Sequence, residues 1–146
     1  MKKLFLLGML LLAFTTFQCK KGTTKAIRNN EIAEASRKQN PDSLSLLQSA
    51  IGTWKWTKRS CYWDGNTTKA DKDISLQLDA NGNYSIREGK AESASGTWQI
   101  QFYQSGSYKL ITNPSNEYLT GLMYVCDKQL LVCNSYIDGC DHLFEK

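Results

Sequence analysis

The stretch Asp73–Glu88, DISLQLDANGNYSIRE, decides the fold, because apolar and polar residues alternate on both sides of a turn signal. The signal is Asn81-Gly82, a dipeptide typical of tight β-hairpin turns. Successive side chains of a strand point to opposite faces, so every second residue shares a face. The apolar residues of this stretch occupy one such face: Ile74, Leu76, Leu78, Tyr84 and Ile86. The stretch predicts two antiparallel strands with one buried side.

The same two-residue period runs through the chain from Gly52 onward. It predicts eight strands, at roughly 53–62, 72–79, 83–88, 95–103, 107–112, 118–126, 129–136 and 140–145. Turn signals recur about every 8–12 residues and no helical pattern interrupts them, which favours an all-β, up-and-down antiparallel domain. Eight strands leave exposed edges unless the sheet closes, so we expect an eight-stranded β-barrel. An open β-sandwich is the alternative architecture.

The inward-facing positions of these strands carry large apolar side chains. A small barrel is wide enough either for its own side chains or for one ligand. The candidates for core or ligand-lining residues are Trp54, Trp56, Leu76, Leu78, Trp98, Ile100 and Phe102.

The chain opens with MKKLFLLGMLLLAF, two lysines followed by about eleven apolar residues, which is the layout of a secretory signal. The apolar run is shorter than the roughly 20 residues that a membrane-spanning helix needs. It ends near Cys19, and the segment resembles a bacterial lipoprotein signal. The resemblance implies that residues 1–18 are removed and that Cys19 carries the lipid. Several acyl chains on one residue hold a protein firmly to a membrane.

Residues 19–40 are polar and are expected to form a tether with transient helix, followed by a folded domain over 41–146. Asn40-Pro41-Asp42 predicts the start of a short helix, with Asn40 as its cap. Leu44, Leu47 and Ile51 would form its apolar stripe, since they recur at three and four residues.

The charge and the motifs of the sequence argue against several classes of function. The net charge of +4 falls to +2 once Lys2 and Lys3 leave with the signal, and the positive residues cluster beside Cys19, so no nucleic-acid surface is indicated. His142 is the single histidine, which excludes a histidine-cluster metal site; we expect it to be a surface or satisfied core residue. The sequence has no Cys-x-x-Cys pair, phosphate loop or nucleophile elbow. We therefore expect no enzyme, no metal and no cofactor.

Four cysteines lie in the predicted barrel, and an exported protein favours disulfides. Alternating strand direction puts Cys61 and Cys140 at the same rim, on strands that closure makes neighbours. Cys61–Cys140 is therefore the favoured disulfide, with Cys133–Cys140 as the alternative. The hairpin at Asp127-Lys128 would set Cys133 too far from Cys126 for a bond. Cys126 is expected to be a buried thiol.

A family resemblance rests on residues 44–146. A short helix that leads into Gly52-Thr53-Trp54 is similar to the opening motif of lipocalins. The segments LDANGNYSI, SGTWQI and DGCDHLFEK look like those of small lipocalin-like lipoproteins of the Bacteroidota. Lipocalins place a late arginine across the opening tryptophan. Here Lys146 is the late basic residue, and it would make a cation–π contact with Trp54 in place of the arginine contact.

The resemblance implies binding rather than catalysis. The expected function is that of a lipid-anchored envelope lipoprotein whose barrel binds a small apolar molecule. The alternative is a sealed barrel that acts as a protein–protein interaction or inhibitor module. The partners would be the membrane, through the acyl anchor, and a small ligand or an envelope protein. The resemblance and the basic residues after Cys19 place the protein at the outer membrane, facing the periplasm.

Overall fold

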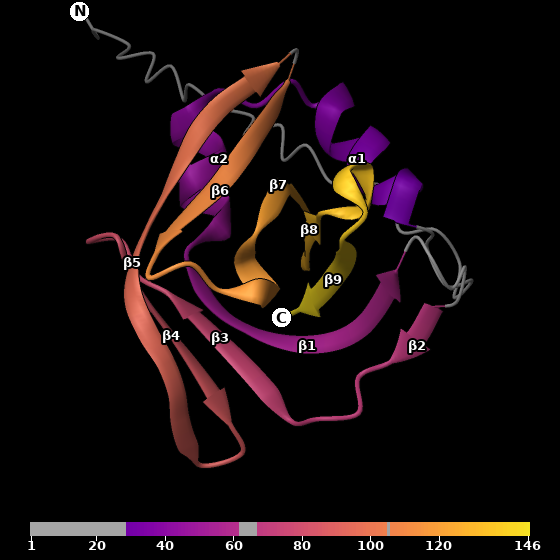
Figure 1. Ribbon diagram of the computed structural model, residues 1–146. Helices are drawn as coiled ribbons and strands as arrows, with labels where there is room; N and C mark the ends of the chain where they lie inside the picture. Colours follow the sequence, from indigo (N-terminus) through magenta and orange to yellow (C-terminus); the bar gives the residue numbers. More distant parts are fainter. Residues whose placement is uncertain (1–28, 62–66, 105) are drawn as a thin grey trace, which may run out of the picture.

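The computed structural model describes residues 29–61, 67–104 and 106–146, which form a closed antiparallel barrel of eight strands (Figure 1). The predicted signal peptide, the first part of the tether and Cys19 lie outside the described residues. The strands of the barrel are β1 (Gly52–Cys61), β3 (Ile74–Leu78), β4 (Asn83–Glu88), β5 (Ala91–Gln104), β6 (Ser107–Asn113), β7 (Gly121–Cys126), β8 (Gln129–Cys133) and β9 (Cys140–Glu145).

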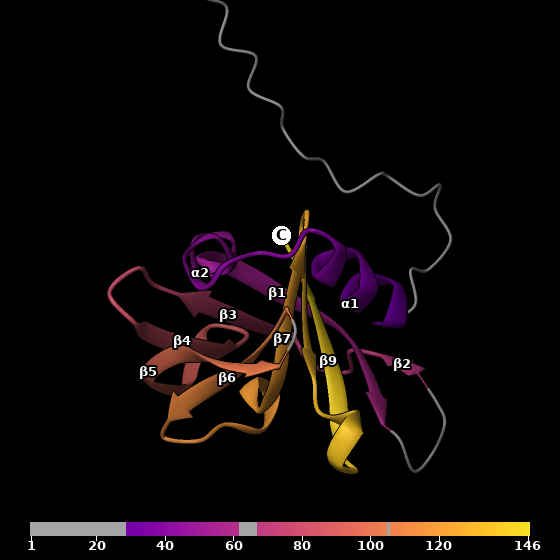
Figure 2. The same cartoon turned by 90° about the horizontal axis from the view of Figure 1, so that it is seen from above.

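Pairing between the first and last strands closes the barrel. Each strand pairs with its neighbour in chain order, and β1 also pairs with β9, with Trp56 opposite Phe144. The predicted barrel is therefore confirmed, and the open sandwich is wrong. A further short strand, β2 (Thr67–Lys69), pairs with the far end of β1 outside the ring of eight (Figure 2).

The β3–β4 hairpin has the predicted register and faces. Leu76 lies opposite Ile86 and Leu78 opposite Tyr84, and all four side chains are buried. Gly82 adopts φ +81°, a left-handed conformation that glycine tolerates without strain. In this hairpin, the alternation of apolar and polar residues therefore predicts which face of each strand packs against the core.

Helix α2 (Ser43–Ala50) covers one end of the barrel, but it begins later than predicted, and of the predicted stripe only Leu47 and Ile51 pack against the core, both partly buried. Asp42, not Asn40, is the cap: its carboxylate accepts a hydrogen bond from the Ser45 amide at 2.7 Å. Leu46 and Ala50, one turn apart, are buried, whereas Leu44 is 63% exposed. Leu44 lies two residues from Leu46, which places it on the opposite side of a helix.

The floor of the barrel is built on Trp54. Its indole Nε1 donates a hydrogen bond to the Ala50 carbonyl at 2.7 Å. The Lys146 ammonium lies 4.1 Å from the centre of the Trp54 ring and donates to the Ile51 carbonyl at 2.9 Å. The predicted cation–π contact between the last residue and the opening tryptophan is therefore present.

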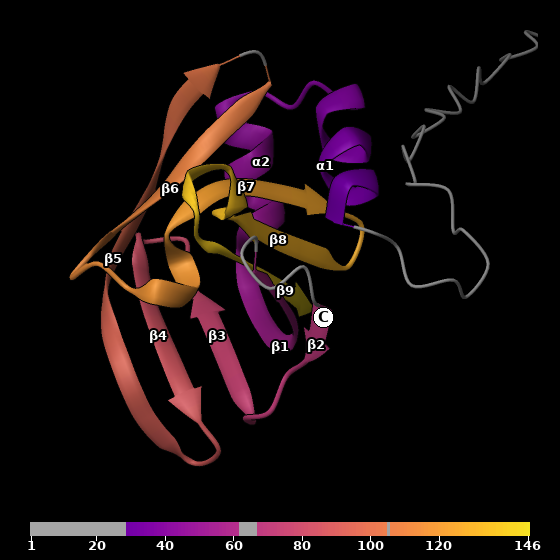
Figure 3. The ribbon, with the colours of Figure 1, turned by 45° about the vertical axis from the view of Figure 1, so that its right-hand side comes forward.

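Helix α1 (Asn29–Lys38) corrects the prediction for the described part of the expected tether, since these residues form a packed helix. It lies against the outer faces of β7 and β8, and its residues Ile32, Ala33 and Ser36 are buried (Figure 3). The reason is that β7 is buried along its whole length, so its outer apolar side chains need a cover. The second apolar cluster, under α1, contains Ile32, Ala33, Leu122, Tyr124, Cys126, Leu131 and Leu143.

The far end of β5 runs to the tip of the β5–β6 hairpin, where β5 is exposed although Ser107 and Tyr108 of β6 are buried (Figure 3). Residues 101–104 are all exposed, and Phe102, predicted to face the interior, is 65% exposed. Its ring instead meets the edge of the Tyr108 ring, with centroids 5.8 Å apart. The prediction is wrong because Phe102 lies two residues from the end of β5, where side chains on both faces of the strand are exposed and the core no longer covers it.

Within the described ranges, neither helix is long and apolar enough to cross a membrane. In the same residues, no group of three or more His, Cys, Asp or Glu side chains is arranged to hold a metal ion.

Candidate functional site

In the described part of the chain, the side chains that point into the barrel pack against one another and fill its interior. One continuous cluster joins residues from α2 and from every strand of the barrel, and most of its members are less than 5% exposed. Of the candidates from the sequence, five are buried in this cluster and Ile100 packs partly buried against it; the five are Trp54, Trp56, Leu76, Leu78 and Trp98. These residues are core residues.

Most polar atoms on the interior aromatic rings have a backbone partner. The Trp98 indole donates to the Asp79 carbonyl at 3.2 Å, as the Trp54 indole does to Ala50. The Tyr84 and Tyr108 hydroxyls donate to the carbonyls of Pro114 and Pro41, at 3.0 and 3.4 Å. This part of the core satisfies the rule that buried polar groups are hydrogen-bonded.

One group of rings departs from that rule, and we call Trp56, Tyr118 and His142 the ring cluster. Their ring centroids lie 5.1–5.8 Å apart. Trp56 is 3% and His142 is 7% exposed, yet within the described residues the Trp56 Nε1 and the His142 Nδ1 have no hydrogen-bond partner. His142 is therefore a buried residue whose ring is not fully hydrogen-bonded, which corrects the expectation of a surface or satisfied core residue. An unpaired buried polar atom costs about 1–3 kcal/mol.

The environment of His142 keeps its imidazole neutral at pH 7. Burial lowers its pKa to about 4, and the positive charge of Arg59, opposite it in the β1–β9 register, contributes in the same direction. Asp141 opposes the shift but does not reverse it. A neutral imidazole has one nitrogen that donates and one that accepts.

His142 therefore predicts a loss of stability in mild acid. Its pKa is lower in the folded than in the unfolded chain, so the unfolded chain binds more protons below pH 6.5. The stability is fully present above that pH and falls as the pH approaches about 4, by up to about 3 kcal/mol. Urea midpoints across this range, with NMR titration of the imidazole, test this. A midpoint that does not change, or titration near pH 6.5, contradicts it.

Cys61, at the end of β1, forms a disulfide with Cys140, the pair that the sequence analysis favoured. The two residues lie directly opposite in the β1–β9 register, as the strand directions predicted. The alternative, Cys133–Cys140, is wrong because Cys133 is a free cysteine that packs against the outer cluster under α1. Burial raises the pKa of the Cys133 thiol to about 11, so it stays protonated. Cys126, predicted to be a buried thiol, is disulfide-bonded, which corrects that prediction.

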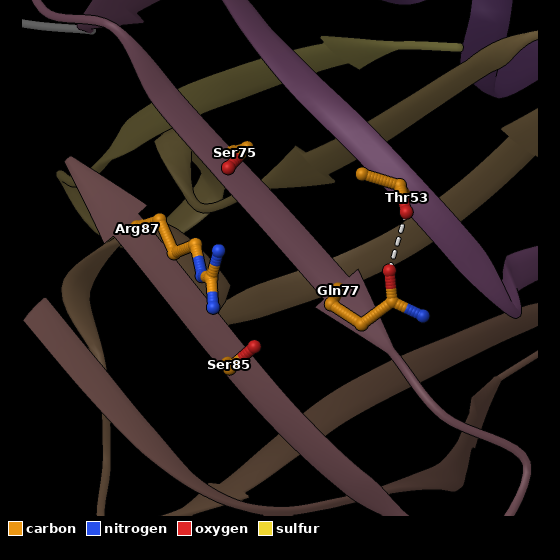
Figure 4. Close-up of a pocket in the computed structure, with 5 residues that line it drawn as sticks. All are labelled: Thr53, Ser75, Gln77, Ser85 and Arg87. Atoms are coloured by element: carbon orange, nitrogen blue, oxygen red, sulfur yellow. Dashed lines mark hydrogen bonds between the residues drawn. The ribbon is translucent and has the colours of Figure 1, made fainter. Parts of the chain in front are cut away.

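The outer face of the barrel carries a hollow of about 340 Å³, lined by Thr53, Ser75, Gln77, Ser85 and Arg87 (Figure 4). We call it the polar hollow. Its residues come from β1, β3 and β4, at the positions that alternate with the buried ones. Sequence reasoning missed this set, although the alternation that identified Leu76 and Ile86 as inward-facing also marks Ser75 and Arg87 as outward-facing.

A second exposed feature is apolar. Tyr103 near the end of β5 and Tyr136 in the short 3-10 turn η2 (Ser135–Ile137) have ring centroids 6.1 Å apart, and both are exposed. Ile137, beside Tyr136, is also exposed. We call these three residues the aromatic patch. Adjoining exposed apolar side chains are a mark of interaction surfaces.

No protein-family model, curated protein or solved structure matches the chain.

Proposed function

We propose that the chain is a lipid-anchored envelope lipoprotein whose sealed barrel acts as a protein–protein interaction module. The observation that carries the proposal is the filled interior. The residues that could have lined a ligand cavity pack against one another in a single core. Recognition then takes place on the outside of the barrel, and the proposed role is binding without catalysis.

The proposed contact surface is the aromatic patch, and the proposed partner is another protein of the envelope. Tyrosine is enriched at protein interfaces because it combines a large apolar ring with a hydroxyl. The two tyrosines come from segments more than 30 residues apart in sequence, β5 and η2, which the barrel holds side by side. A rigid support of this kind limits the entropy lost on binding.

The anchor is proposed at Cys19, by resemblance to lipoprotein signals, with the protein at the outer membrane and facing the periplasm. Lys20, Lys21, Lys25 and Arg28 follow it in the sequence and would meet anionic head groups. An anchored protein meets partners of the same membrane at a high effective concentration.

Replacement of Cys19 tests the anchor. We expect Cys19→Ser to leave the protein unlipidated and to move it from the membrane fraction to the soluble or unprocessed fraction. Intact mass measured without reductant gives the state of the sulfur directly. Unchanged fractionation and mass contradict the anchor. A Cys19 sulfur found in a disulfide also contradicts the anchor, because one sulfur cannot form both a thioether to lipid and a disulfide.

Photo-crosslinking in cells tests the contact surface. We expect a photoreactive residue at Tyr136 to give a discrete cross-linked product with a second protein. The matched control is Gln99, which is also exposed and lies on β5 away from its tip. Equal products at Tyr136 and Gln99, no product, or a product of twice the mass of the chain each contradict the proposed partner.

A second candidate function, binding of a small apolar molecule, is favoured by one observation. The ring cluster holds two buried polar atoms without a partner, Trp56 Nε1 and His142 Nδ1. A ligand with one polar group could pair with both, with its apolar part against the rings. Trp56→Phe removes the indole donor and should weaken binding of any molecule that co-purifies with the protein.

A further inference from the structure

The polar hollow contains three donor groups that no neighbouring side chain uses. Ser75 on β3 lies directly opposite Arg87 on β4, and Ser85 lies two residues along β4 from Arg87. In the described part of the chain, the Ser75 and Ser85 hydroxyls and the Arg87 guanidinium have no hydrogen-bond partner. All three line the same hollow (Figure 4).

The other two lining residues are held in place by hydrogen bonds. The Thr53 hydroxyl donates to the side-chain oxygen of Gln77. The Gln77 amide nitrogen donates to Asp79 at 2.9 Å. Both ends of the Gln77 amide are engaged, so this side of the hollow is a fixed wall. Ser75, Ser85 and Arg87 are left to meet a ligand.

The charge of Arg87 is not neutralised by an ion pair. Within the described part of the chain the ion pairs nearby are Lys55–Asp73 and Lys72–Glu88, each at 3.3 Å, and Arg87 belongs to neither. The β4–β5 register places Glu92 opposite Arg87, but the two form no ion pair. Glu92 is therefore a nearby negative charge that would repel an anion in the hollow.

We propose that the polar hollow binds an oxyanion, the carboxylate or phosphate group of a small ligand. The planar guanidinium presents paired donors that match the oxygens of either group, and hydrogen bonds between charged groups are the strong ones. Ser75 and Ser85 supply two further donors. The volume of about 340 Å³ lies at the lower end of the range of small-ligand sites, about 300–1,000 Å³, which leaves room for part of the ligand beyond its anionic group. This site is independent of the aromatic patch.

Titration of the lipid-anchored protein in detergent with inorganic phosphate and, separately, with acetate tests the site. The amide and guanidinium NMR signals are followed at constant ionic strength. We expect saturable shifts centred on Ser75, Ser85 and Arg87. Saturation with phosphate alone identifies a phosphate ligand, with acetate alone a carboxylate ligand, and with both the shared oxyanion chemistry. No saturable shift at these residues with either probe overturns the proposal.

Three charge variants separate the site from general attraction of anions. Arg87→Gln should weaken binding by about tenfold or more, since it removes a charged hydrogen bond. The control Lys90→Gln removes the same charge from the exposed β4–β5 turn and should change binding by less than about twofold. Glu92→Gln should strengthen binding, because it removes the opposing carboxylate. Equal losses in Arg87→Gln and Lys90→Gln, or weaker binding in Glu92→Gln, contradict the proposal.

Discussion

Trp54→Ala is expected to lower the free energy of unfolding by about 3–5 kcal/mol, the range for a buried tryptophan. Trp54 is 0% exposed and stands at the floor of the barrel. The variant loses the ring, its hydrogen bond to the Ala50 carbonyl and the surface over which the Lys146 ammonium lies. Because a domain is stable by only about 5–15 kcal/mol, the variant should be marginally folded.

Urea unfolding followed by circular dichroism measures the effect. Phe102→Ala is the matched control, since it removes another large aromatic ring, but one that is 65% exposed at the far end of β5. Its midpoint should shift little, as expected for a surface substitution. Equal shifts in the two variants would mean that Trp54 does not close the core.

Loss of the Cys61–Cys140 disulfide is expected to lower the free energy of unfolding by about 2–5 kcal/mol. The bond joins residues 79 apart in sequence, so it restricts a large part of the unfolded chain. It also ties β1 to β9, the strand pair that closes the barrel. The variant Cys61→Ala with Cys140→Ala should retain the barrel, because the hydrogen bonds between the two strands remain.

Cys133→Ala is the control for the disulfide variant. Cys133 is free and half-buried, so its replacement removes one sulfur and no covalent link. Urea midpoints of both variants are compared without reductant. Equal losses of stability would show that the disulfide contributes no more than the packing of one cysteine.

The barrel could be predicted because the alternation of apolar and polar residues along its strands indicates which face of each strand is buried. In Asp73–Glu88 each inward residue is apolar and each outward residue is polar, so the period identifies both strands and the register of the hairpin. The disulfide followed from strand direction alone, since closure makes the first and last strands neighbours. The alternative, Cys133–Cys140 across the last hairpin, was excluded only by the structure, in which Cys133 is free.

The two helices were harder to predict because their faces depend on tertiary packing. The segment of α1 is polar, and only Ile32 is a large apolar residue within it. The available signal lay in the strands: Leu122, Tyr124, Leu131 and Leu143 put apolar side chains on the outer faces of β7–β9, and other apolar residues occupy the inner faces. Strands that are apolar on both faces need a cover, and α1 provides it.

Phe102 shows the limit of strand alternation. Its position shares the face of Trp98 and Ile100, and the period alone cannot tell where a strand leaves the core. For a similar reason, only part of the candidate site could be predicted from the sequence. The polar residues of the hollow lie in the alternating pattern, but the ring cluster joins Trp56, Tyr118 and His142 from three separate segments, which only the folded chain brings together.

Native mass spectrometry of the protein purified from the cells that produce it tests most directly whether the barrel is sealed. The filled interior predicts that no small molecule is bound to the chain in stoichiometric amount. A small apolar molecule that stays bound one to one, and that is lost in Trp56→Phe, would contradict the sealed barrel and establish the ring cluster as the binding site.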